Sequence, residues 1–223
     1  MSPLILAIDT THEFGSIALG RGGEPAEEVP LHAPTGFAHV IYPHLARLVE
    51  RCGVKLEEID CFAAASGPGS FTGVRVGLAC VKGLAEALGK PAAAVSNLAA
   101  VSTFGVSGLR ATVLDARRGE VYGAVYDGAA RIVVPETVMP FPAWLGTLPH
   151  GEMDFVSTDP GIFRSALAGT RFETARLVAA PKALAAAVAR LALARFLRGE
   201  ASDPAALDAN YVRRPDAELN WRE

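Results

Sequence analysis

Residues 66–77 read SGPGSFTGVRVG, a segment rich in glycine that precedes a helical pattern. Glycine-rich turns that open a helix commonly cradle phosphate groups. A dinucleotide-binding fingerprint needs GxGxxG, and here the third glycine falls one place late. A P-loop needs Gly-Lys followed by Ser or Thr, whereas Gly73 is followed by Val74 and Arg75. The segment therefore matches neither phosphate-binding motif.

The same glycines predict close packing of a helix. We expect a turn at residues 67–70 and a helix over residues 72–88 that contains Gly73, Gly77 and Gly83. Each glycine inside a helix costs about 1 kcal/mol relative to alanine, so a close contact must offset the cost. Gly73 and Gly77 are four residues apart and share one face. A helix of the same lobe and a partner subunit are both open as occupants of that face.

Two other kinds of catalytic site, a metal centre and a serine nucleophile, find no support in the sequence. His39 and His44 are five residues apart, about 140° around a helix, whereas two metal ligands on one helix face need a spacing of three or four. We therefore expect surface histidines and no metal site. The GxSxG elbow of serine hydrolases is missing, although Ser66 and Ser70 flank the glycine turn.

Composition limits the class of protein. Half of the 223 residues are hydrophobic and the net charge is −3, which is typical of a globular protein without the basic footprint of an independent RNA binder. Cys52, Cys61 and Cys80 form no CxxC motif, so we expect reduced, buried thiols. The N-terminal MSPLILAIDTT lacks the features of a signal peptide, so a cytoplasmic location without a membrane anchor is predicted.

The hydrophobic pattern predicts a first lobe over residues 1–105. Its elements are a hairpin of two strands (residues 4–9 and 16–19), a third strand (26–31), a helix (36–52), a strand (59–65), the helix 72–88, a short strand (91–95) and a helix capped by Ser96. Pro43 would kink the first helix unless the helix starts near Tyr42.

A second lobe over residues 106–223 repeats this order less regularly. It begins with a hairpin over residues 111–126 and contains a long helix at residues 181–198, followed by a tail. Two βββαβαβα units describe the two-lobed α/β fold shared by actin, hexokinase and Hsp70, with the second lobe degenerate.

That fold implies a candidate nucleotide site, because its active members grip ATP phosphates with the two hairpins. Asp9, Thr10 and Thr11 follow the first strand, and Asp115 ends the corresponding strand of the second hairpin. These four residues are candidate phosphate-facing groups, with ATP or ADP as the candidate ligand. They are equally typical turn formers.

Three motifs in order resemble the TsaB (YeaZ) family of tRNA-modification proteins. They are ILAIDTT at residues 5–11, GPGSFTGVRVG at 67–77 and DARRGEVY at 115–122, and the later NYVRR at 210–214 is similar to that family's C-terminal motif. Phe37 stands where many relatives have histidine, which indicates an apolar contact.

The resemblance implies a subunit that is not an enzyme by itself. It would belong to the complex that transfers a threonylcarbamoyl group to N6 of adenosine 37 in tRNAs reading ANN codons. Implied partners are the catalytic paralogue TsaD, the ATPase TsaE, a second copy of the chain when TsaD is absent, and tRNA only through the complex.

The resemblance also implies that the two first-lobe helices contact TsaD. The predicted interface comprises Gly67, Pro68, Gly69, Ser70, Phe71, Thr72, Gly73, Val74, Arg75, Gly77, Leu78 and Val81. Two alternatives stay open: an autonomous ATP-dependent phosphotransferase of the same fold and, with less support, a metallopeptidase.

Overall fold

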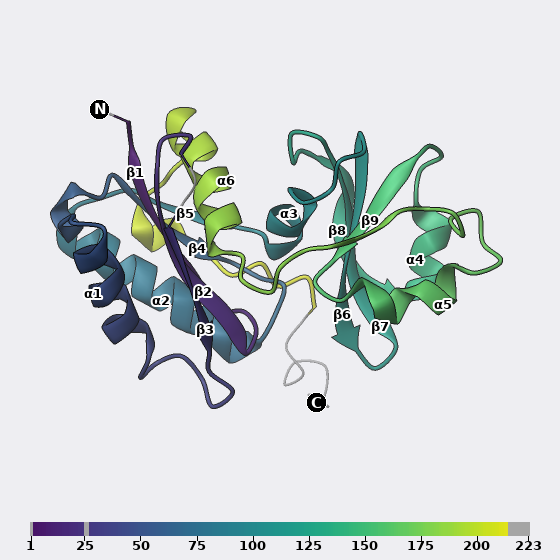
Figure 1. Cartoon of the computed structure of the whole chain (residues 1–223), viewed down its shortest axis with the longest axis horizontal. Coiled ribbons are helices and arrows are strands. Elements are labelled where there is room, and N and C mark those ends of the chain that lie inside the picture. Colours follow the sequence, from purple (N-terminus) through teal and green to yellow (C-terminus); the bar gives the residue numbers. More distant parts are fainter. Residues whose placement is uncertain (1, 25–26, 214–223) are drawn as a thin grey trace, which may run out of the picture. The chain divides into compact units, whose positions relative to one another are not determined.

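The computed structural model describes residues 2–24 and 27–213, and the chain divides into two compact units (Figure 1). The first unit comprises Met1–Asn97 and Lys182–Asn210, and the second comprises Leu98–Pro181 and the chain from Tyr211. The predicted lobe boundary at residues 105 and 106 is therefore about eight residues late. The long helix near the C-terminus, predicted in the second lobe, belongs to the first unit.

The first unit is built on a sheet of five strands in the order β3-β2-β1-β4-β5. β1 (Leu4–Asp9), β2 (Phe14–Arg21) and β3 (Glu27–His32) are antiparallel, and β4 (Cys61–Ala65) and β5 (Ala92–Val95) continue the sheet in parallel with β1. Every residue of β1 and β4 is buried, because helices cover both faces of the sheet.

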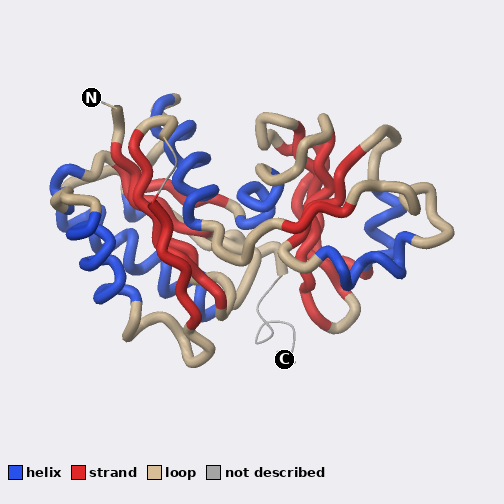
Figure 2. Tube along the Cα trace, in the orientation of Figure 1, coloured by secondary structure: helices blue, strands red, loops and turns tan. Residues whose placement is uncertain are grey.

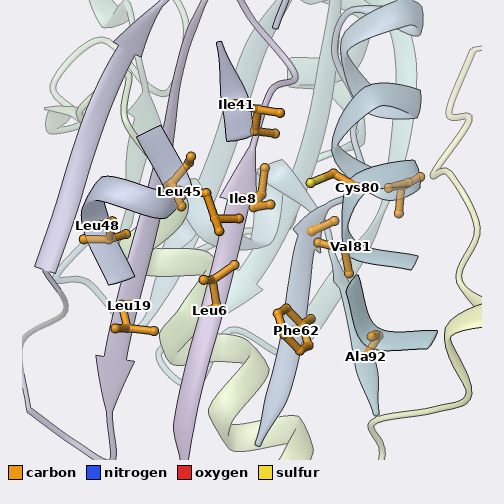
Figure 3. Close-up of a cluster of buried hydrophobic side chains, with 14 of the residues drawn as sticks. Leu6, Ile8, Leu19, Ile41, Leu45, Leu48, Phe62, Cys80, Val81 and Ala92 are labelled. Atoms are coloured by element: carbon orange, nitrogen blue, oxygen red, sulfur yellow. The ribbon is translucent and has the colours of Figure 1, made fainter. Parts of the chain in front are cut away.

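The helices α1 (Ile41–Arg51) and α2 (Phe71–Leu88) cover one face of this sheet, and α6 (Ala185–Leu197) covers the other (Figures 1 and 2). Leu6 and Ile8 of β1 point toward α1 and α2, where they join Leu45 and Val81 in the core (Figure 3). The helices are thus held by apolar side chains that alternate along the strand.

Two helices start later than residues 36 and 181, although the alternative start near Tyr42 for the first of them lies within one residue of the observed start. α1 begins at Ile41 and not at residue 36, because this places Pro43 in the first turn, where its missing N–H group leaves no hydrogen bond unmade. α6 begins at Ala185 and not at Pro181. Its first N–H groups donate to the Ser16 hydroxyl (2.9 Å) and to the Glu28 carboxylate (3.0 Å), so residues of the sheet cap this helix.

The second unit has a sheet in the order β10-β9-β6-β7-β8. Its strands are β6 (Leu109–Arg117), β7 (Glu120–Asp127), β8 (Ile132–Pro140), β9 (Met153–Ser157) and β10 (Leu177–Ala179). The first three are antiparallel and the others are parallel to β6. If the strands of each unit are numbered one to five along the chain, both sheets have the same order, 3-2-1-4-5. This shared order confirms the predicted repeat.

The helices of the second unit are short. They are α4 (Phe141–Thr147) and α5 (Arg164–Leu167). Trp144 of α4 and Leu167 of α5 join Phe155 of β9 in the hydrophobic core of this unit. The connecting helix α3 (Asn97–Ser102) places Leu98 against Tyr126 of β7. Short 3-10 turns occur at Leu56–Glu58, Pro160–Phe163 and Pro204–Ala206.

The three cysteines are unpaired, as expected. Cys61 and Cys80 are buried, and Cys52 is half-buried. Burial raises the pKa of the Cys61 thiol to about 12, so this group stays protonated at neutral pH. Within the described residues, the helices are too short or too polar to cross a membrane.

Candidate functional site: the first hairpin and the α1–α2 face

The turn after β1 packs directly onto the start of α2. The Thr10 hydroxyl donates to the Gly73 carbonyl oxygen (2.7 Å), and the Ser70 N–H donates to the Thr11 carbonyl oxygen (2.6 Å). The Ser70 hydroxyl also accepts from the Gly73 N–H (3.3 Å) and thereby caps the helix. The glycine segment is therefore fixed by the hairpin of its own chain.

This contact explains the glycines of α2. A Cβ atom at Gly73 would lie 2.0 Å from the Thr10 carbonyl oxygen, and one at Gly77 would lie 2.6 Å from the Thr10 hydroxyl. A Cβ at Gly69 would lie 2.5 Å from the Thr11 carbonyl oxygen. The turn after β1 of this same chain therefore covers the face that carries Gly73 and Gly77, and these two glycines give no steric argument for a partner subunit there.

Asp9 lies at the centre of a buried hydrogen-bond network. Its Oδ1 accepts from the Thr11 N–H (2.9 Å) and from the Thr11 hydroxyl (2.7 Å), and that hydroxyl accepts from the Asn97 amide (2.6 Å). The side-chain oxygen Oδ1 of Asn97 in turn accepts from the Gly67 N–H (2.9 Å). Asp9, Thr10 and Thr11 are all buried. Their internal bonds favour a role in holding the turn over a role in binding phosphate.

Burial raises the pKa of the Asp9 carboxyl above its ordinary value, and the hydrogen bonds from Thr11 oppose this only in part. Because the folded chain then binds this proton more tightly than the unfolded chain does, Asp9 makes folding less favourable as pH rises from about 4 through the folded-state pKa.

The variant Asp9→Asn tests this raised pKa, because its side chain cannot ionise. We expect its stability relative to the natural chain to increase between about pH 4 and pH 7, measured by urea unfolding, and a constant difference would contradict the raised pKa.

Asp115, the fourth candidate phosphate-facing group, belongs to the second unit and is exposed. Its Oδ1 accepts from the Arg117 N–H (2.7 Å) in the turn of the second hairpin. Arg213 of the tail donates to the Ala116 carbonyl oxygen (2.9 Å) and forms an ion pair with Glu120. The NYVRR motif therefore anchors the tail on the second hairpin, and its last residue, Arg214, lies outside the described residues.

The predicted interface residues divide into two groups. Seven of the twelve are buried within the chain: Gly67, Pro68, Gly73, Val74, Gly77, Leu78 and Val81. Five are exposed: Gly69, Ser70, Phe71, Thr72 and Arg75. The exposed members lie at the start of α2, where the Arg75 guanidinium stacks 3.6 Å from the centre of the Phe71 ring.

A larger exposed surface continues along α2 and α1. We define the α1–α2 face as Tyr42, Phe71, Thr72, Arg75, Ala79 and Gly83. These residues are exposed, Tyr42 to 55% and Phe71 to 40%, and the spacing of Thr72, Ala79 and Gly83 places them along one side of α2. A Cβ atom at Gly83 would meet no atom within 4 Å. Small side chains thus leave the middle of this face open.

Tyr42 connects the two helices of this face. Its hydroxyl lies close to the Cys80 thiol, and the negative charge of an ionised Cys80 raises the pKa of Tyr42. Cys80 is buried in the core beside Val81 (Figure 3). Contact with this thiol restrains the Tyr42 side chain at the edge of α2. A fixed aromatic ring loses little conformational freedom when another protein covers it.

The two histidines of the α1 region differ in their exposure. His39 is exposed before α1 begins, and His44 is half-buried within it. Among residues 2–24 and 27–213, the histidine, cysteine and acidic side chains form no group of three or more that could hold a metal ion. Phe37 is buried in the core of the first unit and packs beside Gly15, so its apolar contact is internal.

Sequence reasoning did not single out Tyr42, Ala79 or Asn97 as site residues, and it named Gly83 as a helix glycine without including it among the predicted interface residues. The small residues of the α1–α2 face were detectable in principle, because Ala79 and Gly83 are four residues apart and so lie on one side of a helix. Asn97 carried no signal, since its bonds to Thr11 and Gly67 join segments far apart in the chain.

A family model described as "TsaD: tRNA N6-adenosine threonylcarbamoyltransferase" matches residues 28–195. A Bacillus subtilis protein named tRNA threonylcarbamoyladenosine biosynthesis protein TsaB is 30% identical over 98% of both chains. An Escherichia coli protein of the same name is 37% identical over 55% of this chain and 54% of its own.

Two solved structures have the same fold as this chain. A Pseudomonas aeruginosa structure titled YeaZ superposes with a TM-score of 0.79 at 28% identity and covers 94% of this chain and 99% of the other. A second structure from that species, described as similar to peptidase YEAZ, also gives a TM-score of 0.79, with 95% and 100% coverage. The predicted two-lobed fold of the actin, hexokinase and Hsp70 group is thereby confirmed, and the chain belongs to the TsaB (YeaZ) family.

Proposed function

We propose that this chain is a non-catalytic, activating subunit of the complex that transfers a threonylcarbamoyl group to N6 of adenosine 37 in tRNAs reading ANN codons. Its relatives in Bacillus subtilis and Escherichia coli are named for tRNA threonylcarbamoyladenosine biosynthesis. The chain would work in the cytoplasm, bind intact tRNA stably only as part of the complex, and assemble with a TsaD-like transferase and a TsaE-like ATPase.

The observation that carries this proposal is the contrast between the buried turn after β1 and the exposed α1–α2 face. Asp9, Thr10 and Thr11, the residues best placed by sequence to bind phosphate, are buried and bonded within the chain. The α1–α2 face is exposed and combines fixed aromatic groups with small residues. Such a surface suits the close approach of two helices from another subunit.

Both the TsaD-like transferase and a second copy of this chain are proposed occupants of the α1–α2 face. A paralogue has equivalent helices, so one face can pair with either protein. The two assemblies would then compete, and the homodimer would form only when the transferase is absent. Mixing the two chains should convert a homodimer into a heterodimer, which size-exclusion chromatography with light scattering can follow.

The proposal is tested by reconstitution. We expect the transferase, the ATPase, threonylcarbamoyl-adenylate and unmodified tRNA to yield modified adenosine only when this chain is added, as measured by mass spectrometry of digested tRNA. Incubated alone with ATP, this chain should release no ADP above a blank. A transferase that is equally active without the chain would refute the activating role. ATP turnover by the chain alone would favour the phosphotransferase alternative instead.

A further inference from the structure

Three aromatic rings form a stack at the end of the first hairpin, outside the α1–α2 face. Phe14, the first residue of β2, lies directly opposite His32, the last residue of β3. Their ring centres are 4.4 Å apart and the ring planes differ by 10°. The His12 ring lies 5.9 Å from Phe14 with an angle of 14°. We call His12, Phe14 and His32 the ring ladder.

The ring ladder is held in place from two directions. The Phe14 N–H donates to Nδ1 of His12 (3.4 Å), which fixes that imidazole relative to the strand. The Lys182 ammonium lies 4.4 Å from the centre of the Phe14 ring, in the range of a cation–π contact. His12, His32 and Lys182 are exposed, whereas Phe14 is half-buried. Flat rings and a cation are therefore presented together to solvent.

We propose that the ring ladder and Lys182 form a contact site for an unpaired stretch of RNA. Bases of single-stranded RNA bind by stacking on aromatic and histidine rings, and a neighbouring lysine contacts the phosphate backbone. With a net charge of −3 the chain has no general attraction for polyanions, so the contact depends on this local arrangement. A duplex offers no free base face and is not a ligand for the site.

The choice of RNA rests on the proposed role in tRNA modification, whereas the site itself does not require the α1–α2 face or any partner. The proposed subunit role and the proposed RNA site can therefore be refuted by different experiments. Loss of transferase activation would refute the proposed subunit role. A chain without RNA contacts at the ring ladder would refute the site.

The test uses the full chain and nuclear magnetic resonance of its imidazole groups. An eight-residue oligouridine is titrated into the protein at low salt, and a paired RNA of the same length and charge per strand serves as the comparison. We expect the His12 and His32 signals to shift with the single strand and to change little with the duplex. His39, His44 and His150 are internal controls in the same spectrum. Absence of shifts, similar shifts at all five histidines, or equal responses to both RNAs would overturn the proposal.

Variants test whether the rings of His12 and His32 bind RNA by stacking or only stabilise the hairpin. The double variant with His12→Ala and His32→Ala should bind oligouridine at least about fivefold more weakly, and Lys182→Glu should also weaken binding. The double variant with His12→Phe and His32→Phe keeps flat rings and should bind within about twofold of the natural chain. If the phenylalanine variant loses binding as fully as the alanine variant does, stacking is not the source of affinity and the proposal fails.

Discussion

Gly73→Ala is expected to lower the free energy of unfolding by about 2–3 kcal/mol. Inside a helix the same substitution ordinarily adds about 1 kcal/mol of stability, because alanine is the better helix former. Here the new Cβ atom would lie 2.0 Å from the Thr10 carbonyl oxygen. That oxygen belongs to the backbone at the end of β1 and cannot rotate away, so the turn and the helix must separate.

Gly83→Ala is the matched control in the same helix. Its Cβ would meet no atom within 4 Å, so it should raise stability by about 0.5–1 kcal/mol. Thermal unfolding of the two variants should therefore move the melting temperature in opposite directions. If Gly73→Ala were as stable as Gly83→Ala, the contact between the first hairpin and α2 would not be as described.

Ala79→Arg is expected to weaken binding of the TsaD-like transferase at least about 100-fold, as measured by isothermal titration calorimetry. Ala79 is exposed in the middle of α2, and a long charged side chain there would hold another helix away from the α1–α2 face. Arginine is a good helix former, so the fold itself should be unaffected.

The control for Ala79→Arg is Leu197→Arg, which places the same charge at an exposed position of α6. This variant should bind the transferase within about twofold of the natural chain, and both variants should show the natural circular dichroism spectrum. Equal affinity of Ala79→Arg and the natural chain would remove α2 from the interface.

The strands and their order were predictable because the signals are local. The run LILAID is continuously apolar and ends in Asp9, and EVYGAVY alternates, so both hairpins could be placed within a few residues. α2 was also placed within one residue at its start, because Ser70 caps one end and Gly89, with φ of 62°, ends the other.

Features that depend on distant contacts were not predictable in this way. The spacing of Gly73 and Gly77 shows that something approaches α2 closely, but it does not show whether that is another subunit or Thr10 of the same chain. The assignment of α6 to the first unit depends on bonds to Ser16 and Glu28, more than 150 residues earlier. Such contacts leave no periodic pattern in the local sequence.

The central claim, that the α1–α2 face binds the transferase, is tested most directly by photo-crosslinking. The crosslinking residue p-benzoylphenylalanine is placed at Glu86 or at Val133. Glu86 is exposed and follows Gly83 by three residues, so it lies on the same side of α2 as the α1–α2 face, whereas Val133 is an exposed residue of β8. After mixing with the transferase and irradiation, we expect a crosslinked heterodimer from the protein labelled at Glu86 and none from the one labelled at Val133. A heterodimer crosslinked from Val133 and not from Glu86 would contradict the account.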